Sequence, residues 1–408
     1  MNSASSPSSV PSNFSADDSI LGFKYQLRYA LYLLYDAQRA DGLDVAIDIE
    51  RIDDIDVHAA NKLTKLVQTK DTATILTNSS APFWKTIRIW SDAIRNGVVD
   101  PTAIRAFLLV TTSPNPADDS AIVNLLQQNS TESRQEALSQ MQIRAATKRP
   151  QDTLGKAYQA FHDLPSIQQK QLVEKITIQT SAPTFDGLDE LIYDQIVHGP
   201  PNKRVAFGKV LFGRWDQLVE AYLRERSQAK ITWQELQSLL HEISLQFEED
   251  NLPIEFIDML RHAIPSLSDD NRTFMKQLIA IGATPNQRQR AQRLYLKATQ
   301  LLGFWQRNLL VRPDEVLHHN QRLIDECELQ HEGAGTNSGL ASASAEEVGR
   351  HIYKWANEHA PHLEALRIRR RCSDADVIRG CLHALADAPR LGWHPDWNIL
   401  FVSPTLGE

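Results

Sequence analysis

The sequence has 408 residues, a hydrophobic fraction of 42% and a formal net charge of −8 at pH 7. This length exceeds one hydrophobic core of ordinary size, so we expect two domains, or two and a small subdomain. The acidic balance argues against a constitutive DNA binder that works through overall positive charge, because non-specific DNA affinity depends on Lys and Arg meeting phosphates.

Composition indicates neither a membrane protein nor a disulfide framework. No run of about eighteen apolar residues occurs, and the Ser-rich N-terminus lacks the basic flank and apolar stretch of a signal peptide. The three cysteines, Cys327, Cys372 and Cys381, never form a Cys-x-x-Cys pair. We therefore expect a cytoplasmic protein with no membrane partner.

The first part of the chain predicts an α/β domain at residues 19–225, preceded by a disordered tail at 1–18. Seven of the first 15 residues are serine and none is charged, which is typical of a solvated tail. Apolar spacing then predicts a helix over 20–38, strands at 45–49 and 63–70, a helix from Pro82, and a strand at 106–110 buried on both faces. A further strand is possible at 175–179. Trp84 and Trp90 are expected in the core, and the order of elements predicts a small mixed sheet.

Residues 226–408 are predicted to form a mainly helical domain that binds partner proteins. Helical periodicity covers residues 233–248, 253–263, 270–281, 285–303, 313–328, 346–359 and 373–388. The segment 332–345 is rich in Gly, Ser and Ala and predicts a mobile loop. No repeat of fixed period is present, which disfavours a solenoid.

An acidic stretch, Ile47 to Asp56, precedes the triplet Gln68-Thr69-Lys70 and suggests phosphodiester chemistry. A carboxylate at a strand end can hold Mg²⁺, which prefers oxygen ligands. A lysine beside that metal can orient water and offset the charge that grows in the transition state. Because side chains alternate along a strand, Gln68 and Lys70 should share one face, with Thr69 pointing away.

The same residues also fit a purely structural interpretation. Acidic clusters and Gln-x-Lys strings are common, so Asp48, Glu50 and the aspartates that follow could form a solvated strand edge and turn. Lys70 would then be a surface charge. Its position directly after the apolar strand residues Leu66 and Val67 favours the functional interpretation.

Five ordered motifs make the N-terminal resemblance more specific. They are Gly22-Phe23-x-Tyr25-Gln26, Glu50-x-x-Asp53-Asp54-Ile55-Asp56, Val67-Gln68-Thr69-Lys70, Leu76-Thr77-x-Ser79-Ser80 and Phe83-Trp84-Lys85-Thr86-x-x-x-Trp90. Together they resemble the double-stranded-DNA endonuclease domain of bacterial anti-phage effectors, a PD-(D/E)xK family that includes CBASS effectors and the Lamassu nuclease subunit. The resemblance implies a restriction-endonuclease-like α/β fold.

The resemblance also implies roles for individual residues. Asp54 would be the principal metal ligand, Gln68 would occupy the acidic position of the motif, and Lys70 would be the catalytic lysine. Glu50 is a further candidate for catalysis and metal binding, and Gln26 lies near the site in such folds. The implied cofactor is Mg²⁺ or Mn²⁺. Gln68 departs from the pattern, because many relatives carry Asp or Glu there, and this leaves open whether one or two ions bind.

The end of the chain carries a second resemblance. The segment from Gly380-Cys381-Leu382-His383 to Gly392-Trp393-His394-Pro395 resembles the C-terminal domain of ABC-three-component systems, in which a nuclease works with an SMC-like ATPase and a small accessory protein. Both resemblances lead to a Lamassu-type effector. His383 and His394 could bind metal, but without a third ligand at a recognisable spacing a structural role is favoured.

Two basic segments interrupt the acidic chain. They are Arg367-Ile368-Arg369-Arg370-Arg371 and a helix bearing Arg288, Arg290, Arg293 and Lys297. Such segments could meet DNA or an acidic partner, but a solvated helix face is the ordinary explanation.

The leading hypothesis is a metal-dependent double-stranded DNA endonuclease held latent by an SMC-like ATPase and activated by foreign DNA. Self-association on activation is expected, because paired active sites cut both strands efficiently. A non-catalytic adaptor between the ATPase and other factors is an alternative, favoured by the neutral Gln68. A stand-alone restriction endonuclease is a third possibility.

Overall fold

The computed structural model describes residues 16–116, 121–126, 130–147, 153–225, 230–254, 266–267, 270–336 and 342–402. The chain divides into two compact units. The first comprises residues 1–196 and 214–239, and the second comprises residues 197–213 and 240–408. Among the helices described, none has both the length and the apolar character needed to cross a lipid bilayer.

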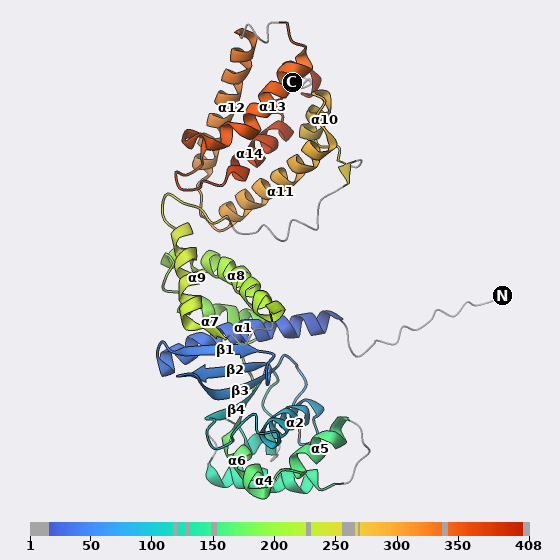
Figure 1. Cartoon of the computed structure of the whole chain (residues 1–408), viewed down its shortest axis with the longest axis vertical. Helices are drawn as coiled ribbons and strands as arrows, with labels where there is room; N and C mark the ends of the chain where they lie inside the picture. The colour runs from blue at the N-terminus through green and yellow to red at the C-terminus, as the bar shows by residue number, and fades with distance from the viewer. Residues whose placement is uncertain are drawn as a thin grey trace, which may run out of the picture. The chain divides into compact units, whose positions relative to one another are not determined.

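The described part of the first unit is built around a six-stranded mixed sheet with the order β5-β4-β3-β2-β1-β6 (Figure 1). The strands are β1 (Val45–Ile49), β2 (Ile55–Ala59), β3 (Lys62–Lys70), β4 (Ala106–Thr111), β5 (Ile176–Gln179) and β6 (Ile231–Thr232). Strands β3, β4 and β5 run parallel, and the other neighbours pair antiparallel. The mixed sheet predicted for the N-terminal part is confirmed.

Strand β2 was not predicted, so the expected order of helix, strand, strand, helix, strand is wrong at this point. All five residues of β2 are buried, including Asp56 and His58. In the sequence, these polar residues belong to a stretch that was expected to be exposed. Ala60 and Asn61 have positive φ angles of 46° and 58°, as tight hairpin turns require, and they link β2 to β3. The alternation over residues 55–59 is that of a strand, but it does not predict that the polar side chains of Asp56 and His58 are buried too.

Helices α1 (Ala16–Asp41) and α2 (Ala81–Arg95) position the sheet. α1 contacts β1, β2 and β3, while α2 packs against β4 and against α5 (Thr153–His162). Trp84 and Trp90 of α2 are fully buried, Trp84 against Tyr158 and Trp90 against Phe107. Their predicted place in the core is confirmed.

The other helices of the first unit lie beyond β4 or flank α1 (Figure 1). They are α3 (Ala121–Asn124), α4 (Thr131–Ala145), α6 (Ser166–Lys175) and α7 (Phe185–Gln195), with parts of α8 (Arg204–Glu225) and α9 (Trp233–Gln246). The indole N–H of Trp215 in α8 donates to the carbonyl of Leu27 in α1 (2.8 Å), which ties α8 to the first helix.

The described part of the second unit is helical, as predicted. Its longer helices are α10 (Thr273–Ala280), α11 (Pro285–Arg307), α12 (Pro313–Thr336), α13 (Ala345–Glu358) and α14 (Ala375–Asp387). α12 continues through the first residues of the predicted 332–345 loop. The predicted helix at 253–263 falls mostly outside the described residues.

The centre of the second unit is the contact between α11 and α14. Gly380 of α14 sits against α11 so closely that a Cβ there would collide with the carbonyl oxygen of Leu294 and the side chain of Ala298. Nearby, His383 is buried among the rings of Phe274, Tyr353 and Trp393. Burial lowers the pKa of His383 to about 3, so the imidazole is neutral at physiological pH.

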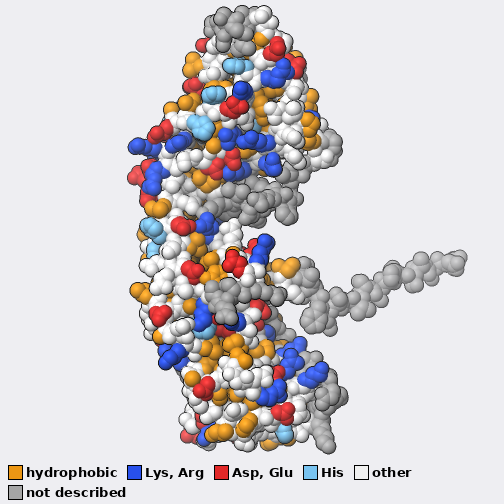
Figure 2. Space-filling model, in the orientation of Figure 1, with side chains coloured by type: hydrophobic (Ala, Val, Ile, Leu, Met, Phe, Trp, Pro, Cys, Tyr) orange, Lys and Arg blue, Asp and Glu red, His pale blue; other side chains and the backbone are white. Residues whose placement is uncertain are grey.

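In the basic segments of the second unit, Lys297 and several arginines of 367–371 form internal ion pairs. Arg369 is paired with Glu315 (2.6 Å) and donates to two backbone carbonyls, while Arg371 pairs with Glu248. Lys297 of α11 is buried and lies 2.6 Å from Asp374. On the face shown in Figure 2, basic and acidic side chains of this unit are interspersed. Arg369, Arg371 and Lys297 therefore help to hold the domain together.

We expect Gly380→Ala to destabilise the second unit, because the added methyl group has no room beside the α11 backbone. The expected loss is about 1–3 kcal/mol of unfolding free energy, despite the better helix propensity of alanine. Gly333→Ala is the matched control, since a Cβ at this helical glycine of α12 meets no atom within 4 Å. Chemical denaturation should show the control unchanged or more stable, and a Gly380→Ala protein as stable as wild type would contradict this packing.

Candidate functional site

The residues predicted to act on DNA surround the loop of residues 50–54 between β1 and β2. Glu50 begins the loop with a positive φ of 57°, which residues other than glycine seldom adopt. Its backbone N–H donates to the carbonyl of Asp54 (3.1 Å) and closes the loop. Backbone outliers of this kind are concentrated at functional sites, which makes the loop a candidate for one.

One carboxylate oxygen of Asp54 is held at the end of β3. Asp54 Oδ2 accepts hydrogen bonds from the backbone N–H and the hydroxyl of Thr69, both at 2.9 Å. Lys70 Nζ lies 3.9 Å from the same oxygen. From the described residues, Asp54 Oδ1 accepts no hydrogen bond. The structure thus brings Asp54 and Lys70 together, and it leaves one carboxylate oxygen available.

Thr69 contributes to this arrangement, contrary to the prediction from strand alternation. Alternation along β3 predicts that Thr69 points away from the site, yet its hydroxyl binds the carboxylate of Asp54. Asp54 precedes the first residue of β2, so its side chain is not bound by the alternation of the paired strands. No signal in the sequence distinguishes Thr69 from an ordinary strand threonine.

Helix α1 fixes the other side of the loop through Gln26. The buried Gln26 amide donates from Nε2 to Glu50 Oε1 (3.0 Å) and to the backbone carbonyl of Asp54 (2.7 Å). Glu50 itself is exposed. The two second-rank candidates from the sequence therefore contact each other and the backbone of Asp54.

Gln68 occupies the strand position that its motif predicts. It lies on β3 two residues before Lys70, is 3% exposed, and pairs in register with Leu109 of β4. Within the described residues, the Gln68 side chain makes no hydrogen bond to Asp54 or Glu50. Gln68 is thus beside the Asp54–Lys70 pair in the sheet, without a direct contact to Asp54.

Two buried aspartates hold the loop in shape. Asp56 accepts the backbone N–H groups of Ile52 and Asp53, both at 3.1 Å. Asp53 accepts the backbone N–H of Asp54 (3.0 Å) and the indole N–H of Trp90 (2.5 Å). Burial raises the pKa of Asp53 and of Asp56 to about 7, and the charge of Asp54 adds to the shift at Asp53.

The arrangement can support metal-assisted chemistry on an anionic substrate. Asp54 and Lys70 are both partly exposed, and they place a carboxylate and an ammonium group next to each other at the end of β3. Asp53, Asp56 and Trp90 act behind them, because they fix the loop backbone from inside the core. Asp53 and Asp56 therefore have a structural role, but they are buried and do not form the solvated strand edge and turn of the alternative interpretation.

The comparisons with known proteins concern the second unit. Residues 274–401 match CTD7, the C-terminal domain 7 of the ABC-three component (ABC-3C) systems. The match supports a subunit of an ABC-3C anti-phage system, in agreement with the resemblance noted at the end of the chain. No curated protein matches the sequence.

We expect Trp90→Phe to lower the unfolding free energy by about 2 kcal/mol at pH 8, because a buried carboxylate loses its indole donor. Trp84→Phe is the matched control. Its indole donates to a neutral carbonyl, that of Asn78, and its loss should cost about 1 kcal/mol at any pH.

The two variants should differ in their pH dependence. The folded-state pKa of Asp53 is raised to about 7, so ionisation of Asp53 weakens folding as the pH rises through that value. At pH 5 the carboxyl is protonated, and the excess loss in Trp90→Phe should shrink. Urea denaturation at pH 5 and pH 8 measures this, and an excess loss independent of pH would contradict the role of the Asp53 charge.

Proposed function

We propose that the chain is a metal-dependent double-stranded DNA endonuclease and the effector subunit of an ABC-3C defence system of the Lamassu type. The observation that carries the proposal is the convergence of Asp54 and Lys70, 3.9 Å apart, where β3 ends and β2 begins in the middle of a mixed sheet. This arrangement agrees with a restriction-endonuclease-like site of the PD-(D/E)xK class.

The donor set suits a hard divalent cation. Asp54 Oδ1 is available, and Thr69 and Lys70 already fix the other oxygen. Asp54 would hold Mg²⁺ or Mn²⁺, and Glu50 and Gln68 would be the further oxygen donors. When bound, the ion would lower the pKa of a coordinated water and withdraw charge from the scissile phosphate.

Lys70 and the loop would supply the remaining chemistry. The Lys70 ammonium lies where it can orient a water molecule and offset the negative charge that grows on phosphate oxygens. Gln26 and Thr69 hold Asp54 from two sides, through its backbone carbonyl and its carboxylate. A carboxylate held in this way loses little freedom when substrate binds, which favours reaction.

The match to CTD7 supports the proposal that the chain acts as one subunit of a multi-component complex. We propose that the second unit docks the nuclease on an SMC-like ATPase with a small accessory subunit, which keeps it latent until foreign DNA is sensed. Self-association on activation would pair two sites, one for each DNA strand. The net charge of −8 supports latency, because an isolated acidic subunit attracts DNA weakly.

We expect Lys70→Ala and Asp54→Ala to reduce cleavage of plasmid and linear DNA by at least about 100-fold with Mg²⁺ present. The assay uses the full chain assembled with the proposed ATPase and accessory subunit. Lys65→Ala is the matched control, because Lys65 lies on the same strand with similar exposure but pairs with Asp36. Cleavage by Lys70→Ala at the wild-type rate would overturn the proposal.

A non-catalytic adaptor is the second candidate, favoured by the neutral amide of Gln68 at the motif's acidic position. The two functions differ in what the variants do to phage protection by the complete system. An adaptor should protect equally well with Ala at Asp54 or Lys70, whereas a nuclease effector should lose protection with either substitution.

A further inference from the structure

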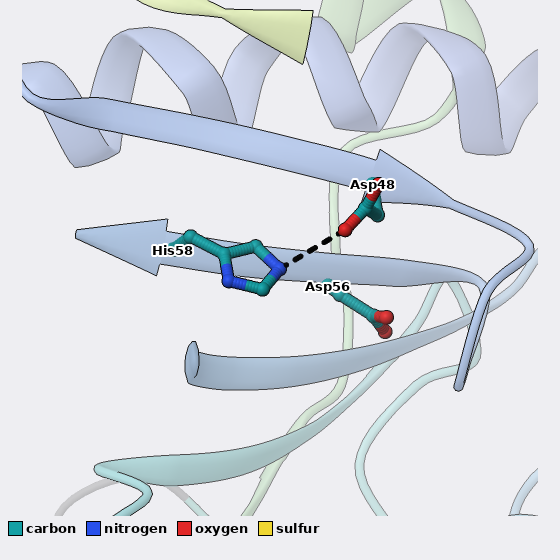
Figure 3. Close-up of side chains that lie close together, drawn as sticks. All are labelled: Asp48, Asp56 and His58. Atoms are coloured by element: carbon teal, nitrogen blue, oxygen red, sulfur yellow. Dashed lines mark ion pairs between the residues drawn. The ribbon is translucent and has the colours of Figure 1, made fainter. Parts of the chain in front are cut away.

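A second cluster of ligand-type side chains lies on the β1–β2 hairpin, apart from the Asp54–Lys70 pair. Asp48 of β1 and Asp56 and His58 of β2 each offer one ligand atom, and these atoms all lie within 4.8 Å of one another (Figure 3). All three side chains are buried. Neither the nuclease proposal nor the CTD7 match accounts for this cluster.

His58 is the least satisfied member. Its ring is about nine-tenths buried, and neither Nδ1 nor Nε2 makes a hydrogen bond with any described residue. Figure 3 shows the ring directed at Asp48, with Nε2 3.2 Å from Asp48 Oδ2 but outside hydrogen-bond geometry. A buried imidazole without hydrogen bonds costs free energy, which a coordinated ion would offset.

The two carboxylates reinforce this conclusion. Asp48 and Asp56 stand directly opposite each other in the antiparallel register, and like charges in that position destabilise a sheet. The nearest guanidinium, that of Arg51, reaches Asp48 only at 4.0 Å. Backbone N–H bonds to both oxygens of Asp56 fix its orientation and leave lone pairs free, as outer-shell bonds do for metal-binding carboxylates.

A route for an ion exists beside the cluster. His58 lines a pocket of about 280 Å³, together with Asp44, Asn61, Lys230 and Thr232. Lys230 is engaged by Asn61 Oδ1 (3.1 Å) at its rim. The pocket borders the imidazole of His58, and it has room for a water molecule as an additional ligand.

We propose that Asp48, Asp56 and His58 bind a divalent transition-metal ion, with Zn²⁺ the best fit. One imidazole nitrogen and two carboxylate oxygens are a donor set that Zn²⁺ accepts, with water completing a tetrahedron. The ligand atoms lie within 4.8 Å of one another, and they would have to approach to roughly 3.3 Å to share a tetrahedral ion with bonds of about 2.0 Å. The ion cross-links β1 and β2 and so stabilises the hairpin whose loop contains Asp54.

The experiment uses full-length protein freed of metal by a chelator and then exposed to Zn²⁺ or Co²⁺ alone. Metal content after desalting should be one ion per chain at this site, and the melting temperature should rise by about 5 °C or more. His58→Gln and Asp48→Asn should weaken zinc binding by at least about 100-fold. Bound Co²⁺ should show the visible absorption of a low-coordinate nitrogen and oxygen site.

Two controls separate this site from others. His162→Gln removes an exposed histidine 3.8 Å from Asp163 and should leave zinc binding unchanged. Asp54→Asn should abolish DNA cleavage but keep the zinc ion, so failure of the nuclease proposal and failure of this one remain distinguishable.

The overturning results are equally specific. They are no tightly bound ion in the wild-type protein, wild-type affinity in His58→Gln, or loss of zinc in Asp54→Asn instead. If His58→Gln does not fold, the cobalt spectrum of the wild-type chain decides: all-oxygen, six-coordinate cobalt would exclude a His58 ligand.

Discussion

The position of Asp54 depends on hydrogen bonds from the backbone N–H groups of loop 50–54 to the carboxylates of Asp53 and Asp56. Loop 50–54 has no strand partner, so its N–H groups need other acceptors, and Asp53 and Asp56 supply them from within the core. Thr69 then fixes the Asp54 carboxylate against β3. An acidic loop that would otherwise be mobile is thereby held in one conformation beside Lys70.

This mode of support lowers stability. Burial of Asp53 and Asp56 raises the pKa of each to about 7, so at neutral pH the folded chain holds carboxylates that water would solvate better. The indole of Trp90 offsets part of this cost at Asp53. Two buried carboxylates around one loop destabilise the fold, and such groups are concentrated at functional sites.

Sequence patterns predicted the helices and strands that bury one apolar face in the core, because their apolar residues recur at regular spacing. α1, α2, β1, β3, β4 and β5 follow from apolar spacing, and the helical second unit follows in the same way. β2 was missed although Ile55, Val57 and Ala59 alternate with Asp56 and His58 as in a strand, because Asp56 belongs to an acidic stretch that was interpreted as a turn. The predicted 332–345 loop begins too early for a similar reason, since α12 extends to Thr336 through residues of low helix propensity.

Some contacts of the candidate site were predicted from the sequence, and others were not. The pairing of Asp54 with Lys70 was implied by the resemblance of the motifs to a nuclease domain, whereas the spacing of these residues alone is a weak signal. The contacts of Asp54 with Thr69 and of Asp53 with Trp90 could not be predicted, because each joins residues far apart in the chain through side-chain orientation. The buried Asp48–His58 contact was hidden likewise by the missing strand.

Charge distribution bears on how the proposed nuclease would meet its substrate. DNA affinity grows with each Lys or Arg that is free to displace counterions from phosphate. In the second unit, Arg369, Arg371 and Lys297 are already paired with acidic side chains, and the chain as a whole carries a charge of −8. Releasing those pairs for DNA would leave partly buried carboxylates without cations, which is costly. Under the proposed function, another subunit would present the DNA, and the isolated chain would bind DNA weakly.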